Sequence, residues 1–278
     1  MKPPGHALHP GPSELWVRHF VLGYIVLLVA VPFGALLFFA FRDGIQPFWE
    51  RITTPVALSA VGLTLWTGLL VGSINAVLGT MTAWVLVRYP FPGKSLLSAA
   101  VDLPLAIPTL VAGVMLAILY GPTSFVGTHL SLWGIDIIFA KPGIVLALLL
   151  VTVPFVVRAV EPVLTELDPA EEEAAIVLGA GPIRTFRTVH LPAILPAAVS
   201  GSLRSLGRAM GEFGSIVVVA GNIPEATLTA PVYIFGEIES GQAEGAAAVG
   251  ALLLLIALTL HGIARLLERT TGARHAQS

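Results

Sequence analysis

The sequence predicts an all-α, polytopic membrane protein with six transmembrane helices. Of its 278 residues, 55% are hydrophobic and 12% are charged, whereas a soluble domain carries about 25% charged residues. The mean hydropathy is +0.87. A soluble protein of this size lacks the interior to bury so many apolar side chains, and a disordered chain is poor in them. Several charge-free runs also reach the roughly 20 residues that a helix needs to cross a membrane.

The first three spans are predicted at about 20–41, 57–86 and 96–120. The first is a charge-free run of 22 residues, which is too long for the apolar core of a signal peptide. The second ends before the turn 88–94, whose two prolines do not continue a helix. The third contains Asp102, Pro104 and Pro108, so we expect an irregular helix. Asp102 belongs either to the cytoplasmic end of this span or to an irregular stretch near an entrance.

The last three spans are predicted at about 142–158, 194–220 and 245–264. Glycine, proline, serine and threonine interrupt the stretch 121–141, which we therefore expect to be an external loop. The stretch 161–192 is the most charged part of the chain and must lie outside the lipid. These elements form a single membrane domain over 16–270, between the tails 1–15 and 271–278.

The distribution of basic residues predicts the orientation. Six spans place both termini on the same side of the membrane. With the termini in the cytoplasm, ten of the 15 lysines and arginines are cytoplasmic, three are external and two lie in the fifth span. Cytoplasmic loops are enriched in lysine and arginine, so both termini are predicted to be cytoplasmic.

Several function classes are excluded by composition and by missing motifs. The net charge of −2 offers no basic surface for nucleic acid, and the absence of cysteine removes disulfides and thiolate metal sites. Gly-x-Ser-x-Gly, His-Glu-x-x-His and a paired intramembrane aspartate motif are absent, which argues against an intramembrane enzyme. We expect no catalytic residues and no metal ligands.

Gly93-Lys94-Ser95 matches a fragment of the phosphate-binding loop G-x-x-x-x-G-K-[ST]. The full pattern needs a glycine where this chain has Arg88, and the fragment lies in a two-proline turn without a preceding soluble strand. We therefore interpret it as a chance match. If ATP drives this protein, a partner must hydrolyse it; a secondary transporter, the remaining alternative, would work without such a partner.

The loop 161–192 predicts two short helices that meet at a glycine. Asp168 is a suitable N-cap with Pro169 in the first turn, and the glutamates that follow lie where the helix dipole favours anions. Gly179 or Gly181 ends this helix, and the second helix ends at Pro192. The loop is either a docking element for a soluble partner or an ordinary solvated loop.

One motif in this loop resembles a known family. Glu173-Ala174-Ala175, three residues, Gly179, nine residues and Val189-His190-Leu191-Pro192 are similar to the EAA loop of ATP-binding-cassette import permeases. That family's pattern is E-A-A, three residues, G, nine residues, I-x-L-P, and this chain departs from it at Val189. The resemblance implies a type I importer permease with the MetI-like fold in the inner (plasma) membrane. It also implies an ATPase-docking loop that includes Glu173, Ala174, Ala175, Gly179, Leu191 and Pro192.

Further stretches, at 102–109, 154–158, 167–169, 207–214 and 220–224, are similar to the T-type subunit of the sulfate/thiosulfate permeases. The molybdate/tungstate permeases share the Gly-Glu-Phe-Gly element and are the alternative. The resemblance implies three partners: an ABC ATPase dimer that binds ATP and Mg, a second related permease and an extracytoplasmic sulfate-binding protein. No cofactor is expected in this chain.

Three charged residues, Arg204, Arg208 and Glu212, recur every four residues in the fifth span and should share one helix face. Charge within a bilayer normally faces a cavity or a partner. Either this face lines the path of an anion, or Arg208 and Glu212 form a structural pair that holds the helix in the bundle. Both interpretations remain open at this point.

Overall fold

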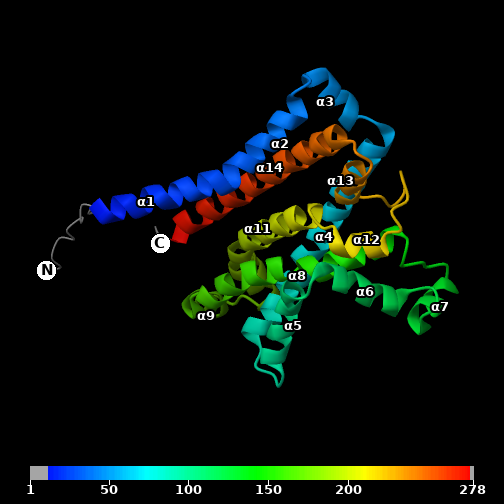
Figure 1. Ribbon diagram of the computed structural model, residues 1–278. Coiled ribbons are helices and arrows are strands. Elements are labelled where there is room, and N and C mark those ends of the chain that lie inside the picture. The colour runs from blue at the N-terminus through cyan, green and yellow to red at the C-terminus, as the bar shows by residue number, and fades with distance from the viewer. Residues whose placement is uncertain (1–11, 276–278) are drawn as a thin grey trace.

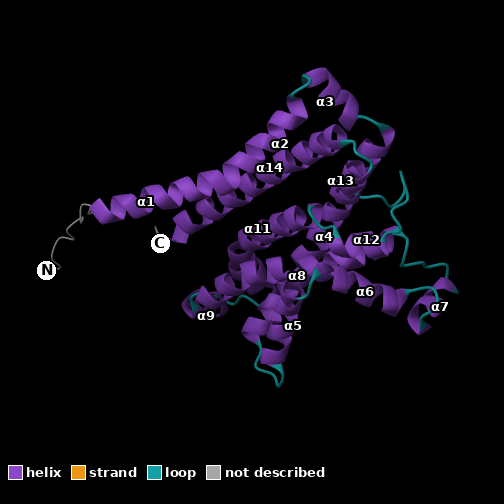
Figure 2. Ribbon diagram, viewed as in Figure 1, coloured by secondary structure: helices purple, strands orange, loops and turns teal. Residues whose placement is uncertain are grey.

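A computed structural model describes the backbone of residues 12–275 and the side chains of residues 16–267. All regular structure in this part of the chain is helical, and no strand occurs in it (Figure 2). This confirms the predicted all-α class. The tail 1–15 lies almost entirely outside the described residues.

The helices follow one another through short connections. In chain order, the elements are α1 (Pro12–Ile25), the π-helical segment η1 (Val26–Ala30), α2 (Val31–Phe41), α3 (Ile45–Ile52), α4 (Pro55–Arg88), α5 (Lys94–Ala106), α6 (Thr109–Tyr120), α7 (Phe125–Ser131), α8 (Lys141–Glu166), α9 (Pro169–Val177), α10 (Pro182–Thr185), the π-helical segment η2 (Phe186–His190), α11 (Leu191–Met210), α12 (Gly214–Val219), α13 (Ala230–Glu239) and α14 (Ala243–His275).

Four single helices in the described chain are long and apolar enough to cross a membrane. They are Trp16–Phe41, Pro55–Arg88, Lys141–Glu166 and Ala243–Leu267, and they contain the predicted first, second, fourth and sixth spans. The fourth extends well beyond the predicted end at 158. The charged residues near position 158 do not end the helix, because Arg158 forms salt bridges with both Asp102 and Glu161.

The predicted third span, 96–120, is two helices rather than one. The axes of α5 and α6 differ by 111° across a two-residue break at Ile107 and Pro108. A residue before proline is pushed out of the helical region, and Ile107 accordingly has φ −82° and ψ 131°. Pro104, in contrast, lies inside α5 without ending it.

The fifth predicted span, 194–220, is also divided. The helix α11 ends at Met210, and α12 begins at Gly214. At the other end, the prediction that a docking helix stops at Pro192 is wrong, because α10, η2 and α11 form one continuous helix. The N–H of Leu191 donates to the carbonyl of Phe186, five residues earlier. This wider π-helical turn, placed immediately before Pro192, accommodates the proline ring.

The centre of the bundle consists of α4, α8 and α11. Asn75 on α4 is buried and donates to Thr152 on α8 at 2.8 Å and to Ser205 on α11 at 3.1 Å. Glycines allow the helices to approach closely: a Cβ at Gly79 would lie 2.7 Å from the Cβ of Val156 on α8. Small residues and shared polar groups are the usual means by which transmembrane helices associate.

Helices α1, α2 and α14 lie together on one side of this centre (Figure 1). The continuous helix α1–η1–α2 runs antiparallel to α14, so the two ends of the described chain lie near each other (Figure 1). Helices α3 and α7 lie toward the opposite end of the molecule (Figure 1). The most apolar 18-residue stretch of the first span contains no buried residue. Its apolar side chains are therefore available to lipid or to another protein.

Candidate functional site: the docking loop and the charged helix break

The first helix of the loop 161–192, α9, is formed by local capping. A carboxylate oxygen of Asp168 accepts a hydrogen bond from the N–H of Ala170 at 2.9 Å, and Pro169 occupies the first turn. Glu171 and Glu172 follow in that turn, where the helix dipole favours negative charge. These contacts confirm the capping predicted from the sequence. No residue of α9 is buried, so the helix projects from the rest of the structure.

The corner after α9 is at Gly179. This glycine has φ +82°, whereas Gly181 has an ordinary φ of −74°. The N–H of Gly179 donates to the carbonyl of Ile176, and the N–H of Ala180 donates to that of Ala175, each at 2.9 Å. This pair of bonds is a Schellman motif, in which a left-handed residue ends the helix. The three-residue spacing between Ala175 and Gly179 is therefore the spacing that this turn requires.

The corner exposes apolar side chains. Ile176, Val177, Leu178 and Ile183 are between 59% and 86% exposed, although the surrounding loop is charged. The basic residues Arg184 and Arg187 line a shallow cavity of about 510 Å³ beside them. Contiguous exposed apolar residues with a polar border are typical of a protein interaction site.

The other residues of the loop motif are spread along the segment. Glu173 and Ala174 are exposed on α9. Leu191 and Pro192 are exposed in the continuous helix beyond the corner, so the structure does not bring them into the exposed apolar group.

Contacts that the sequence did not predict attach α9 to the end of α4. Arg88, the last residue of α4, contacts Glu172 with Nη1 at 2.8 Å and donates from Nη2 to Nδ1 of His190 at 3.1 Å. Its guanidinium lies 5.3 Å from the ring centre of Trp84. Burial, followed by the charge of Arg88, holds the pKa of the His190 imidazole below its usual value. In its uncharged form, the imidazole can accept the hydrogen bond from Arg88 at Nδ1.

Asp102 is paired at the same end of the bundle. Its two oxygens accept from Nε and Nη2 of Arg158 at 2.8 and 2.6 Å, and Nη2 also donates to the carbonyl of Ser98 at 2.9 Å. Arg158 pairs in addition with Glu161, where the charged loop 161–192 begins. Asp102 therefore lies beside the loop end of α8, which favours the interpretation that placed it at the end of its span.

The charged residues of the fifth span are arranged differently from the prediction. Arg204 and Arg208 lie on α11, but Glu212 lies past the helix end, so the three residues do not share one helix face. Arg208 still forms a salt bridge with Glu212 at 2.7 Å. The second Glu212 oxygen accepts from the N–H and the hydroxyl of Ser215 at 3.0 and 2.9 Å. The Glu212 side chain is 1% exposed and that of Arg208 is 33% exposed.

The two helix breaks meet at this point. A Cβ at Gly214, the first residue of α12, would lie 2.9 Å from the amide nitrogen of Leu110 in α6. A Cβ at Gly113 would lie 2.8 Å from the carbonyl oxygen of Ser215. Irregular backbone within a membrane is tolerated where protein buries it or where it lines a cavity. These glycines allow α6 and α12 to approach each other closely at the two breaks.

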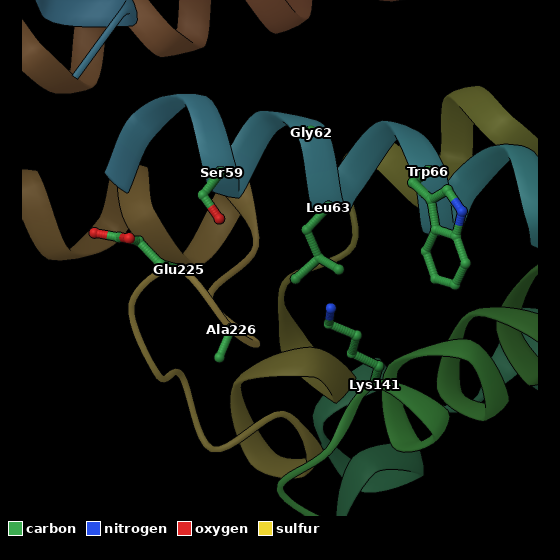
Figure 3. A pocket seen from close by; sticks show the side chains of 7 residues that line it. All are labelled: Ser59, Gly62, Leu63, Trp66, Lys141, Glu225 and Ala226. Atoms are coloured by element: carbon green, nitrogen blue, oxygen red, sulfur yellow. The ribbon is translucent and has the colours of Figure 1, made fainter. Parts of the chain in front are cut away.

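A cavity of about 360 Å³ lies at the opposite end of the molecule from the docking loop. Figure 3 shows the Lys141 amino group pointing into the space between α4 and the connection that carries Glu225 and Ala226. Ser59 and Trp66 line it from α4 (Figure 3). The sequence identified Lys141 as an external charge and gave no signal for the cavity. Among the described residues, no group of three or more histidines or carboxylates could hold a metal ion.

Comparisons with known proteins agree with this architecture. Residues 75–272 match the family described as the binding-protein-dependent transport system inner membrane component. A probable sulfate transport system permease protein of Nephroselmis olivacea is 45% identical, over 88% of this chain and 86% of the relative. The sulfate transport system permease protein CysT of Synechocystis sp. is 43% identical, over 94% of this chain and 90% of the relative.

The fold is also found in solved structures. A chain of a bacterial alginate ABC transporter, crystallised with an alginate pentasaccharide-bound periplasmic protein, superposes with a TM-score of 0.75. The two chains are 18% identical, and the match covers 93% of this chain and 96% of the other. At that identity the likeness concerns the fold alone. The family match and the identities above show that this chain belongs to the family of binding-protein-dependent transport system inner membrane components.

Proposed function

We propose that this chain is a permease subunit of an ATP-driven importer that moves sulfate or thiosulfate across the inner membrane. The observation that carries the proposal is the Gly179 corner, which holds exposed Ile176, Val177 and Leu178 at the tip of a projecting helix. Such a surface has no use in an isolated membrane protein, but it suits a soluble partner. The names of the relatives support sulfate as the substrate.

The partner at the corner is one subunit of an ABC ATPase dimer, which binds ATP and Mg and hydrolyses the nucleotide. The α9 part of the docking loop contacts the ATPase through Glu173, Ala174 and Ala175. Gly179 sets the angle between α9 and the helix that follows it. Leu191 and Pro192 are the first residues of α11, where the loop joins that helix. A second, related permease completes the pathway, and an extracytoplasmic binding protein delivers the anion. No cofactor is needed in this chain. Both termini and the docking loop lie in the cytoplasm, as the ten-to-three distribution of basic residues favours.

The anion path follows α11. Arg204 is exposed and Arg208 is partly exposed, and a Cβ added at Gly207, between them, would meet no described atom within 4 Å. This open, positively charged face is suited to a divalent oxyanion. Glu212 has a different role: its buried carboxylate holds Arg208 and caps α12, so it fixes the arginine rather than contacting the anion.

Transport follows from a shift between two states. Closure of the ATP-bound ATPases draws the two docking loops together and favours an outward-facing pathway. The binding protein then releases the anion into that pathway. Hydrolysis separates the ATPases and returns the pathway to the inward-facing state.

The test is uptake of labelled sulfate into vesicles that contain the complete complex, with unlabelled molybdate as a competitor. The expected result is uptake that requires ATP and the binding protein and that excess molybdate leaves largely unchanged. Uptake without an ATPase would contradict the proposal in favour of a secondary transporter. Molybdate uptake that sulfate does not displace would assign the chain to the alternative substrate class.

A further inference from the structure

Arg88 holds together three segments that are far apart in the sequence. It is the last residue of α4, while Glu172 lies in the first turn of α9 and His190 is the last residue of η2. Arginine suits this place because its planar guanidinium can donate in two directions and lie over an aromatic ring at the same time. Trp84, one turn earlier in α4, provides that ring.

The surroundings keep the arginine in one position. The Trp84 ring packs edge-to-face with both His190 and Phe186, with ring centres 4.9 and 5.4 Å apart. His190 is 4% exposed, so its neutral ring presents a fixed acceptor to Arg88. The arginine is therefore held by a carboxylate, an imidazole nitrogen and an aromatic face together.

The docking helix has little else to hold it against the bundle. No residue of α9 is buried, and one of its ends is a glycine corner. Glu172 is the residue of α9 for which the structure gives a salt bridge to another helix. The same carboxylate also lies 3.7 Å from Nε2 of His190. Without the Glu172 carboxylate, α9 would be attached chiefly through its two chain connections and could pivot when a partner pulls on the corner.

A displacement of Arg88 is transmitted along α4 to the centre of the bundle. Helix α4 runs unbroken for 34 residues with no proline in its interior. At Asn75 it is hydrogen-bonded to both α8 and α11. The close contacts at Gly72 and Gly79 leave little space for it to slide independently. A displacement at one end of α4 is therefore transmitted to its neighbours.

We propose that Arg88 is a positioning residue that couples the docking helix to α4, so that ATPase movement reaches α4 directly as well as α11 through the chain. This inference rests on the proposed docking function of the loop. It adds a specific route: Glu172 to Arg88, along α4 to Asn75, and from there to Thr152 and Ser205.

The test compares ATP hydrolysis with sulfate uptake in vesicles holding the whole complex. Arg88→Gln should still assemble with the ATPase and hydrolyse ATP, while the sulfate moved per ATP falls by about tenfold, within the usual range of coupling between sites. Lys94→Gln is the matched control, because Lys94 is an exposed basic residue six residues after Arg88 and has no ion pair among the described residues. It should leave the ratio unchanged.

A second variant tests the same pair in case Arg88→Gln fails to assemble. Glu172→Gln removes the same pair from the exposed helix, where no buried packing is at risk, and should lower the ratio in the same direction. Arg88→Glu combined with Glu172→Arg should restore part of it, because His190 can change tautomer and donate to a carboxylate. An unchanged ratio in Arg88→Gln and Glu172→Gln would overturn the proposal. Failure of the unaltered chain to bind an ATPase would instead contradict the docking function.

A distance measurement tests the rigid attachment directly. The chain contains no cysteine, so spin labels can be attached to cysteines introduced at Tyr89 and Ala170, which are both exposed. The distance between them should be the same without nucleotide and with a non-hydrolysable ATP analogue, and it should differ between these states in Glu172→Gln. A distance that changes equally in both proteins would also overturn the proposal.

Discussion

The docking end and the helix breaks in the bundle are built by different means. At the docking end, each turn is determined by neighbouring residues: Asp168 caps α9, and the bonds at Ala175 and Ile176 end it at Gly179. At the breaks, α6 and α12 are held by contacts between distant residues, such as Gly214 against Leu110. The first region is exposed, whereas Glu212 and Ser215 at the second are buried. This difference predicts that changes at the breaks affect assembly of the permease, whereas changes at the docking end affect its partner.

The largest effect is expected at the charged break. Arg208→Met leaves the buried Glu212 carboxylate without its arginine. Breaking a buried pair costs about 3–5 kcal/mol, and because Arg208 is one-third exposed we expect the lower end of that range. The amount of assembled complex should fall, as measured by size-exclusion chromatography after solubilisation.

The double variant distinguishes the effect of Arg208 on assembly from its effect on sulfate uptake. Arg208→Met with Glu212→Gln removes both charges and keeps an oxygen that can accept from Ser215. Assembly should recover, while sulfate uptake stays low by about tenfold, or 1.4 kcal/mol in the barrier. Full uptake by the double variant would show that Arg208 has no direct role toward the anion.

A smaller effect is expected from the glycine contact between the breaks. Gly214→Ala places a Cβ against Leu110 and Thr109, and overpacking of this kind costs about 1–3 kcal/mol. The melting temperature of the assembled complex should fall. Gly207→Ala is the matched control, since its added Cβ would meet no described atom within 4 Å. Equal melting temperatures for the two variants would refute the close approach of α6 and α12.

The N-cap of α9 should have an effect of about 1 kcal/mol. Asp168→Ala removes the acceptor of the Ala170 N–H and should speed hydrogen exchange in the first turn of α9, without lowering the yield of the permease. Asp168→Asn retains an oxygen acceptor and should exchange nearly as slowly as the unaltered protein. Faster exchange throughout the bundle in Asp168→Ala would contradict the local character of the docking end.

The smallest effect is expected at the motif glutamate. Glu173 is exposed, and one exposed charge pair contributes about 0–1 kcal/mol. Glu173→Lys should therefore weaken ATPase binding by less than about tenfold in a titration of the purified partner. A complete loss of binding would mean that Glu173 is buried at the docking interface, in a way that its exposure in the free chain does not indicate.

The same contrast explains what the sequence could predict. Caps, the glycine corner and the long apolar helices depend on residues close in the sequence, and these predictions agree with the structure. The end of α11 at Met210 is not predicted by the sequence. The helical spacing of Arg204, Arg208 and Glu212 suggests a helix that continues to Glu212, whereas Glu212 lies beyond the helix end and caps α12. The sequence predicts an irregularity at Pro108, but it does not predict the angle of 111° between α5 and α6.

The partners in the long-range contacts are not predicted by the sequence alone. Arg88 is 102 residues from His190, and Asn75 is 130 residues from Ser205. The sequence predicts Arg88 only as one of ten cytoplasmic charges, and Asn75 lies inside a charge-free run. An amide side chain within a long apolar helix is the one feature that indicates a hydrogen-bonded centre, because such a residue normally finds a partner in the bundle.

The most direct test of the docking function is ATPase binding by Gly179→Val compared with Gly181→Val. Gly179 has φ +82° and Gly181 has φ −74°. A left-handed conformation costs a side-chain-bearing residue roughly 1–2 kcal/mol, so valine should distort the corner only at position 179. The account predicts normal membrane insertion of both variants, with ATPase co-purification and ATP-driven sulfate uptake lost in Gly179→Val and retained in Gly181→Val. Normal co-purification and uptake with Gly179→Val would contradict it.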